Sequence, residues 1–155
     1  MNESTFSADS FAAPLPWQLE QWSQLSRALA AGQLAHAYLL AGSAGLGKSL
    51  FAKSFARTML CLKPTTKKVA GKEVRVPCGE CANCLKGCAG NHPDIVHIEV
   101  EEGSKNIKID QIRWLSEFVI RSSHSGGAKV AIVQDARLLN GNAANALLKT
   151  LEEPN

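Results

Sequence analysis

The residues with the clearest chemical meaning lie in one segment, residues 42–49, which reads GSAGLGKS. Its spacing is G-x-x-x-x-G-K-[ST]. A short apolar run, residues 38–41, precedes the segment, and an amphipathic stretch that reaches Leu60 follows it. Between a strand and a helix, glycines let backbone amides turn toward phosphate oxygens, and the helix N-terminus adds its positive dipole end. Lys48 would then reach the outer phosphates and the Ser49 hydroxyl would bind Mg²⁺. The alternative is a glycine-rich strand-to-helix turn that binds nothing. The expected cradle is made of Gly42, Ser43, Ala44, Gly45, Leu46, Gly47, Lys48 and Ser49.

Five cysteines form the second group of residues that could do chemistry. Three of them have the spacing C-x2-C-x2-C, namely Cys78, Cys81 and Cys84. Thiolates three residues apart in a turn can converge on one cation, and Zn²⁺ takes four such ligands in a tetrahedron. The spacing leaves the fourth ligand open between three residues: Cys61, Cys88 and His92. Because four protein ligands leave no position for a water molecule, such a site is structural rather than catalytic.

The same cysteines also match a second kind of metal site. Residues 78–88 contain C-x2-C-x2-C-x3-C, a spacing found in ferredoxins that bind iron–sulfur clusters, but Ala89 stands where proline would follow. Nothing else in the chain indicates electron transfer, so zinc is the favoured interpretation. A colourless purified protein would exclude the iron–sulfur alternative.

The bulk composition limits the class of protein. The 155 residues are enough for one domain with a core, and 45% of them are hydrophobic. The net charge of +3 is too small to indicate nucleic-acid binding by itself. We expect a cytoplasmic protein without a membrane span, because we find no signal peptide and no apolar run long enough to cross a bilayer. Basic residues gather in residues 63–77, where a solvated loop is commoner than a nucleic-acid contact.

Hydrophobic periodicity predicts how helices and strands alternate along the chain. Apolar residues at helical spacing predict helices at residues 19–29, 48–61, 109–119 and 143–151. Short apolar runs predict strands at residues 38–41, 95–100 and 130–133. Asp110 is expected to cap the third helix and Pro154 to end the last one, while residues 1–15 form a flexible tail. This alternation predicts an α/β fold with a mainly parallel sheet.

Several of these segments together resemble a known family. They are HAYLLAGSAGLGKS, the cysteine module, NHPD, IKIDQIRWL and NAANALLKTLEEP, and they cover nearly the whole chain beyond residue 15. This combination is similar to the bacterial sliding-clamp loader ATPases, the AAA+ subunits of the DNA polymerase III holoenzyme. Within the family, the opening Pro16-Trp17-Gln18 and the pair His92-Pro93 resemble the delta-prime group more than the gamma/tau group.

The resemblance implies a fold, ligands and partners. Residues 16–155 would be a partial AAA+ domain, a P-loop NTPase core with an inserted zinc-binding module at residues 61–88. The family's zinc ligands fall on Cys61, Cys78, Cys81 and Cys84, which leaves Cys88 as a spare thiol. ATP or ADP with Mg²⁺ would occupy the phosphate loop. Partners would be the other loader subunits (gamma/tau and delta), the sliding clamp and primed DNA, with no membrane involved.

Two positions depart from the pattern of an active ATPase in this family. The metal-binding Asp falls on Gln134, and the catalytic Glu falls on Asp135, whose side chain is one methylene shorter. A neutral Gln cannot hold Mg²⁺ strongly, and Asp135 either orients a water molecule or simply caps the next turn. The resemblance thus implies slow or absent hydrolysis, as suits a subunit regarded as the stator of the loader. The alternative is an ATP-hydrolysing gamma/tau-type motor.

Other activities have less support from the residues. A P-loop kinase would need an acceptor pocket and an Arg-rich lid, which we do not find. The holoenzyme is a DNA-directed DNA polymerase, but polymerase chemistry needs paired metal-binding carboxylates that this chain lacks. The family's arginine finger, sensor strand, lid and collar would lie beyond residue 155. We therefore expect either a marginally stable fragment or an incomplete sheet with exposed apolar surface.

Overall fold

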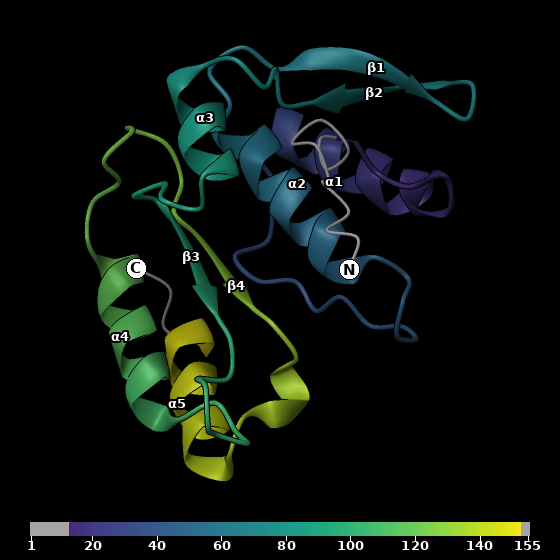
Figure 1. Ribbon diagram of the computed structural model, residues 1–155. Helices are drawn as coiled ribbons and strands as arrows, with labels where there is room; N and C mark the ends of the chain where they lie inside the picture. The colour runs from purple at the N-terminus through teal and green to yellow at the C-terminus, as the bar shows by residue number, and fades with distance from the viewer. Residues whose placement is uncertain (1–12, 153–155) are drawn as a thin grey trace, which may run out of the picture. The chain divides into compact units, whose positions relative to one another are not determined.

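The computed structural model describes residues 13–152, which divide into two compact units (Figure 1). The first unit contains the described residues up to 35 and residues 39–92, and the second contains residues 36–38 and those from 93 onward. Residues 1–12 of the predicted tail lie outside the described range, as does Pro154, the predicted end of the last helix. None of the helices within residues 13–152 is long and apolar enough to cross a membrane.

The first unit is built from three helices and a hairpin. Its elements are a 3-10 turn η2 (Pro16–Gln18), α1 (Leu19–Ala30), α2 (Lys48–Leu60), β1 (Thr65–Val69), β2 (Lys72–Val76) and α3 (Ala82–Cys88). The core is aromatic, because Trp22 is fully buried and meets Phe51 and Phe55 edge-on at centroid distances of 5.4 and 5.2 Å. Edge-to-face packing is favourable for aromatic rings and adds to the gain from burial. The predicted helices 19–29 and 48–61 are confirmed.

The second unit is a parallel strand pair covered by two helices (Figure 1). Its elements are β3 (Ile95–Ile98), α4 (Ile109–Ile120), β4 (Val130–Val133), a 3-10 turn η3 (Ala136–Leu138) and α5 (Gly141–Glu152). The register runs from Ile95 opposite Val130 to Ile98 opposite Val133. The buried core of this unit is Ile98, Ile107, Ile112, Leu115 and Ala143. A mixed α/β fold with a short parallel sheet is therefore confirmed.

Residues 65–76 form an antiparallel β-hairpin rather than the predicted solvated loop. Ala70 and Gly71 both have positive φ, 46° and 80°, as in the two-residue turns that match the twist of hairpin strands. Val74 and Val76 alternate along β2 and are buried in the core of the first unit. The sheets in residues 13–152 are thus one parallel and one antiparallel pair.

The strand predicted for residues 38–41 is wrong. These residues form no strand, and the Leu39 side chain is 83% exposed. A strand is stable only when its backbone N–H and C=O groups are paired in a ladder, and no ladder in the described range includes this segment. Tyr38, Leu39 and Leu40 are therefore exposed, in agreement with the expected apolar surface.

The cap of α4 also differs from the prediction. Lys108, not Asp110, is the N-cap, and its backbone N–H donates to Gln111 Oε1 at 2.9 Å. Asp110 lies inside the first turn, where its carboxylate accepts from Arg113 at 3.1 Å. An acidic residue in the first turn still complements the helix dipole.

Candidate metal centre and phosphate loop

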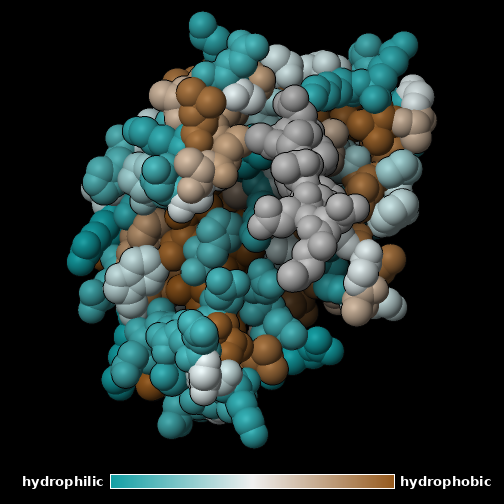
Figure 2. All heavy atoms as spheres, viewed as in Figure 1, coloured by the Kyte–Doolittle hydropathy of each residue, from teal (hydrophilic) through white to brown (hydrophobic). Residues whose placement is uncertain are grey.

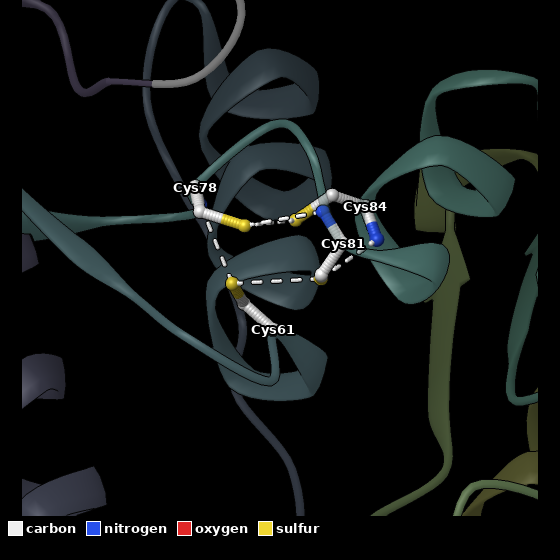
Figure 3. Close-up of side chains that lie close together, drawn as sticks. All are labelled: Cys61, Cys78, Cys81 and Cys84. Carbon is white, nitrogen blue, oxygen red and sulfur yellow. Dashed lines mark hydrogen bonds between the residues drawn. The ribbon is translucent and has the colours of Figure 1, made fainter.

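Four cysteine side chains converge on one point in the first unit (Figure 3). Cys61 directly follows α2, Cys78 follows β2, Cys81 is the N-cap of α3, and Cys84 lies in its first turn. All four sulfur atoms lie within 4.8 Å of one another. The Sγ atoms of Cys61 and Cys81 are 3.9 Å apart, as are those of Cys78 and Cys84.

These separations are compatible with a tetrahedral metal site. With Zn–S bonds of about 2.3 Å, the sulfur atoms of a tetrahedral site lie about 3.8 Å apart. A disulfide would instead need about 2.05 Å between sulfur atoms. The 3.9 Å spacings are therefore compatible with four thiolates around one metal ion.

The backbone around the cluster stabilises thiolates. The amides of Cys78, Cys81 and Cys84 donate to the sulfurs of Cys61, Cys78 and Cys81 at 3.3, 3.3 and 3.4 Å. Burial raises the pKa of Cys81, but the amides of Cys84 and Leu62 and the neighbouring thiols outweigh it and lower that pKa to about 6. The amides of Glu80 and Cys81 lower the pKa of Cys78. A lowered pKa favours the thiolate form, which is the form that binds a cation.

The pKa values of the two buried thiols shift in the opposite direction. Burial raises the pKa of both Cys61 and Cys84. A divalent cation between the four sulfurs would offset this cost, because a coordinating thiol is deprotonated outright. The arrangement therefore suits a metal ion better than it suits four free thiols.

The hairpin explains how Cys61 joins the cluster across a long insertion. Since Thr65 pairs with Val76, the two strands return the chain to its starting point and place Cys78 beside Cys61. Asn83 Nδ2 also donates to Leu60 O at 2.8 Å and so ties α3 to the end of α2.

The other two candidate ligands do not belong to the group. Among the described residues the four converging thiols are Cys61, Cys78, Cys81 and Cys84. Cys88 is exposed at the end of α3, and His92 is buried outside the group.

The predicted phosphate loop, residues 42–49, has the backbone that its glycines predict. Gly42, Gly45 and Gly47 have φ of 148°, 81° and 78°, values that residues with a side chain rarely adopt. α2 begins at Lys48 immediately after the loop and has no acidic residue in its first turn. The Lys48 ammonium donates to Gly42 O at 2.9 Å and to Ser43 O at 2.7 Å. An ammonium group and a helix N-terminus thus lie together at the loop, an arrangement that favours an anion.

The 3-10 turn η2 holds the loop of residues 42–49 in place. The sequence did not predict this role. Gln18 Nε2 donates to the carbonyls of Leu46 and Gly47 at 2.9 and 3.1 Å, and Trp17 Nε1 donates to Leu46 O at 3.2 Å. A Cβ at Gly47 would lie 2.7 Å from Leu15 Cδ1. Glycine at position 47 therefore allows both the positive φ and the close approach of the Leu15 side chain.

Gln134 and Asp135 follow β4 in the second unit. Asp135 has φ of 56°, and its two carboxylate oxygens accept from Arg137 Nε and Nη2 at 2.8 and 3.0 Å. Asp135 is the N-cap residue of η3, as the capping interpretation predicts, although its side chain makes no capping hydrogen bond. The pairing raises the pKa of Arg137 through the hydrogen bond and charge of Asp135. The Asp135 carboxylate is therefore paired with the Arg137 guanidinium, and this pairing competes with any hydrogen bond that the carboxylate would accept from a water molecule.

A buried carboxylate organises the parallel strand pair. Asp94, directly before β3, is fully buried and accepts the backbone amides of His124 and Ser125, each at 2.8 Å. The hydroxyls of Ser123 and Ser125 also donate to it. Burial raises the pKa of Asp94, but these donors outweigh it and hold that pKa well below its usual range. Asp94 thus fixes the loop that leads into β4.

Comparison with known proteins places these features in a family context. A family model described as "DNA polymerase III, delta subunit" matches residues 17–155. DNA polymerase III subunit delta′ of Pseudomonas aeruginosa is 47% identical over 139 residues, which cover 90% of this chain and 39% of that protein. The Escherichia coli K12 subunit delta′ is 37% identical over the same shares. Subunit tau/gamma of Haemophilus influenzae is 35% identical over 130 residues, 84% of this chain and 17% of that protein. The chain thus spans about two fifths of the length of the delta′ relatives.

Proposed function

The chain belongs to the delta′ family of DNA polymerase III subunits, and from that premise we propose that it is a stator-like part of the replicative clamp loader. In this role it would help to load the sliding clamp onto primed DNA. Its partners would be the gamma/tau and delta subunits, the clamp and the primed DNA. The observation that carries the proposal is the family match across residues 17–155, which includes both the phosphate loop and the cysteine cluster.

The fold proposed for this role is a P-loop NTPase core of the AAA+ type. Residues 42–49 would hold ATP or ADP, with backbone amides on the phosphates, the Lys48 ammonium on the outer phosphates and the Ser49 hydroxyl on Mg²⁺. In the nucleotide-bound state Lys48 would exchange its contacts with Gly42 O and Ser43 O for phosphate oxygens. The contacts from Trp17 and Gln18 would keep the loop open for this exchange.

The metal in the proposal is a structural Zn²⁺ held by Cys61, Cys78, Cys81 and Cys84. α2 begins at the phosphate loop and ends at Leu60, next to Cys61, so one helix joins the two proposed sites. A metal ion at its end would fix that helix against α3 and the hairpin. We infer that zinc stiffens the nucleotide-binding unit and takes no part in a reaction.

Hydrolysis is not expected to be this chain's contribution. Gln134 cannot neutralise Mg²⁺ charge, and the carboxylate of Asp135 is engaged by Arg137. The second candidate function is a gamma/tau-type motor, favoured by the 35% identity to the tau/gamma subunit and by the presence of one carboxylate at the catalytic position. The two functions differ in whether this subunit turns over ATP.

Reconstitution tests the role in the loader. The full chain, mixed with the gamma/tau and delta subunits, is expected to co-elute with them in size-exclusion chromatography. The resulting complex should load clamps onto primed DNA, and omission of this chain should reduce loading to background. Failure to co-elute, or full loading without the chain, would remove the basis for the proposal.

A further inference from the structure

The positive charge of the chain is concentrated on the β1–β2 hairpin and the two residues before it, residues 63–76. Residues 63–76 contain five of the 17 Lys and Arg residues and one of the 14 Asp and Glu residues, a net charge of +4. Since the whole chain carries +3, all other residues together carry −1. The low overall charge therefore conceals a strongly basic segment on an otherwise nearly neutral chain.

The hairpin carries exposed cations on both faces, although one face also bears Val74 and Val76, which are buried in the core of the first unit. The register places Lys67 opposite Val74 and Val69 opposite Lys72, so Lys67 and Lys72 are diagonal neighbours on one face. By the same register, Lys68 and Arg75 are diagonal neighbours on the other face. Diagonal pairs in an antiparallel ribbon lie roughly 7–8 Å apart. All four side chains are exposed.

These cations have no partners within the described part of the chain. The ion pairs found between residues 13 and 152 all lie in the second unit, and none involves the hairpin. Glu73 stands opposite Lys68 but makes no ion pair with it in this range. Figure 2 shows hydrophilic side chains gathered along the upper edge, where Figure 1 places the two strands.

The base of the hairpin is held firmly. Val74 and Val76 are buried beside Trp22, whose Nε1 donates to Arg75 O at 2.9 Å. The strands are joined to the cysteine cluster through Cys61 at one end and Cys78 at the other. A charged ribbon on such a base is preorganised, so little conformational entropy is lost when it binds.

We propose that the β1–β2 hairpin is a DNA-binding arm whose cations contact the phosphate backbone. A two-stranded ribbon has the dimensions to approach a duplex groove, and its exposed Lys and Arg side chains can contact phosphates there. Backbone contacts of this kind are independent of base sequence. The choice of DNA, rather than another polyanion, rests on the proposed function in replication. The positive charge of the hairpin and its position are observations that do not depend on that function.

The test is fluorescence anisotropy of a labelled primed duplex titrated with the full chain at several salt concentrations. Changing Lys67, Lys68 and Lys72 together to Gln is expected to weaken binding at least ~10-fold at about 0.1 M salt and to reduce the salt slope by about 2.7, since each neutralised phosphate contributes about 0.9. The matched control changes three other exposed lysines, Lys53, Lys105 and Lys149, to Gln. It removes the same charge from the chain and should leave affinity and slope nearly unchanged.

Three outcomes would overturn the proposal: no binding by the wild-type chain, unchanged affinity in the hairpin variant, or equal losses in both triple variants. Loss of subunit co-elution in the hairpin variant with DNA binding intact would instead assign the hairpin to an acidic protein surface. DNA binding that depends on the hairpin in a chain that fails to join the loader would uphold this inference and refute the proposed function. A loader that assembles normally, in which the hairpin binds no DNA, would uphold the proposed function and refute this inference.

Discussion

Replacing Cys81 by Ser is expected to abolish stoichiometric zinc binding and to lower the free energy of unfolding by more than about 4 kcal/mol, the range typical of a lost metal site. Cys81 is the most informative position because it is also the N-cap of α3. Ser is a good N-cap residue, so the variant keeps the local helix signal while it loses a metal ligand. Elemental analysis and urea unfolding of the same sample measure the two effects.

Cys88 to Ser is the matched control. This thiol is exposed at the end of α3 and lies outside the four-sulfur group, so its loss should change stability by less than about 0.5 kcal/mol. Retained zinc and wild-type stability in Cys81→Ser would contradict the assignment of that ligand. A brown protein containing iron and sulfide would establish the iron–sulfur alternative in place of zinc.

Replacing Asp94 by Asn is expected to lower the stability of the second unit by about 3 kcal/mol at pH 7, because buried amides and hydroxyls lose a charged acceptor. The side-chain size is unchanged, so packing is preserved. Native-state hydrogen exchange of β3 and β4 amides measures the effect within this unit alone. The amide of Val130, which donates to Asp94 O at 2.8 Å, is a suitable reporter.

The pH dependence of the same variant gives a second readout. The folded-state pKa of Asp94 lies below its unfolded value, so its stabilising contribution is complete above about pH 4 and is lost as pH falls through the folded pKa. The stability difference between wild type and variant should therefore shrink between about pH 4 and pH 2. Asp110→Asn, which alters an exposed carboxylate, should cost less than about 0.5 kcal/mol. Equal effects of the two substitutions would show that Asp94 has no special role.

The glycine backbone of residues 42–49 and most helices could be predicted because their signals are local; phosphate binding by that loop stays a prediction. The glycine spacing of residues 42–49 requires positive φ, and the structure has it at Gly42, Gly45 and Gly47. The cysteine spacing likewise predicted a shared site, although it could not decide between Cys61, Cys88 and His92. That choice depends on a hairpin that returns the chain over residues 65–76.

The features that were missed depend on contacts between distant residues. The hairpin is anchored by Trp22, which donates to Arg75 O across 53 positions. The phosphate loop is held by Gln18, and the strand pair by Asp94, through partners about thirty positions away. Conversely, residues 38–41 are a short apolar run with no strand beside them in the described range, so the local apolar pattern gave the wrong answer.

Single-turnover ATP hydrolysis in the reconstituted loader measures the central claim most directly. The phosphate-loop lysines of the other subunits are changed to Ala, so that any turnover comes from this chain; Lys48→Ala in this chain sets the background. The expected result is nucleotide bound at this subunit with hydrolysis no faster than in Lys48→Ala, and at most a small gain in a Gln134→Asp variant. Brisk, Lys48-dependent turnover by the wild-type chain would contradict the stator assignment and favour the motor.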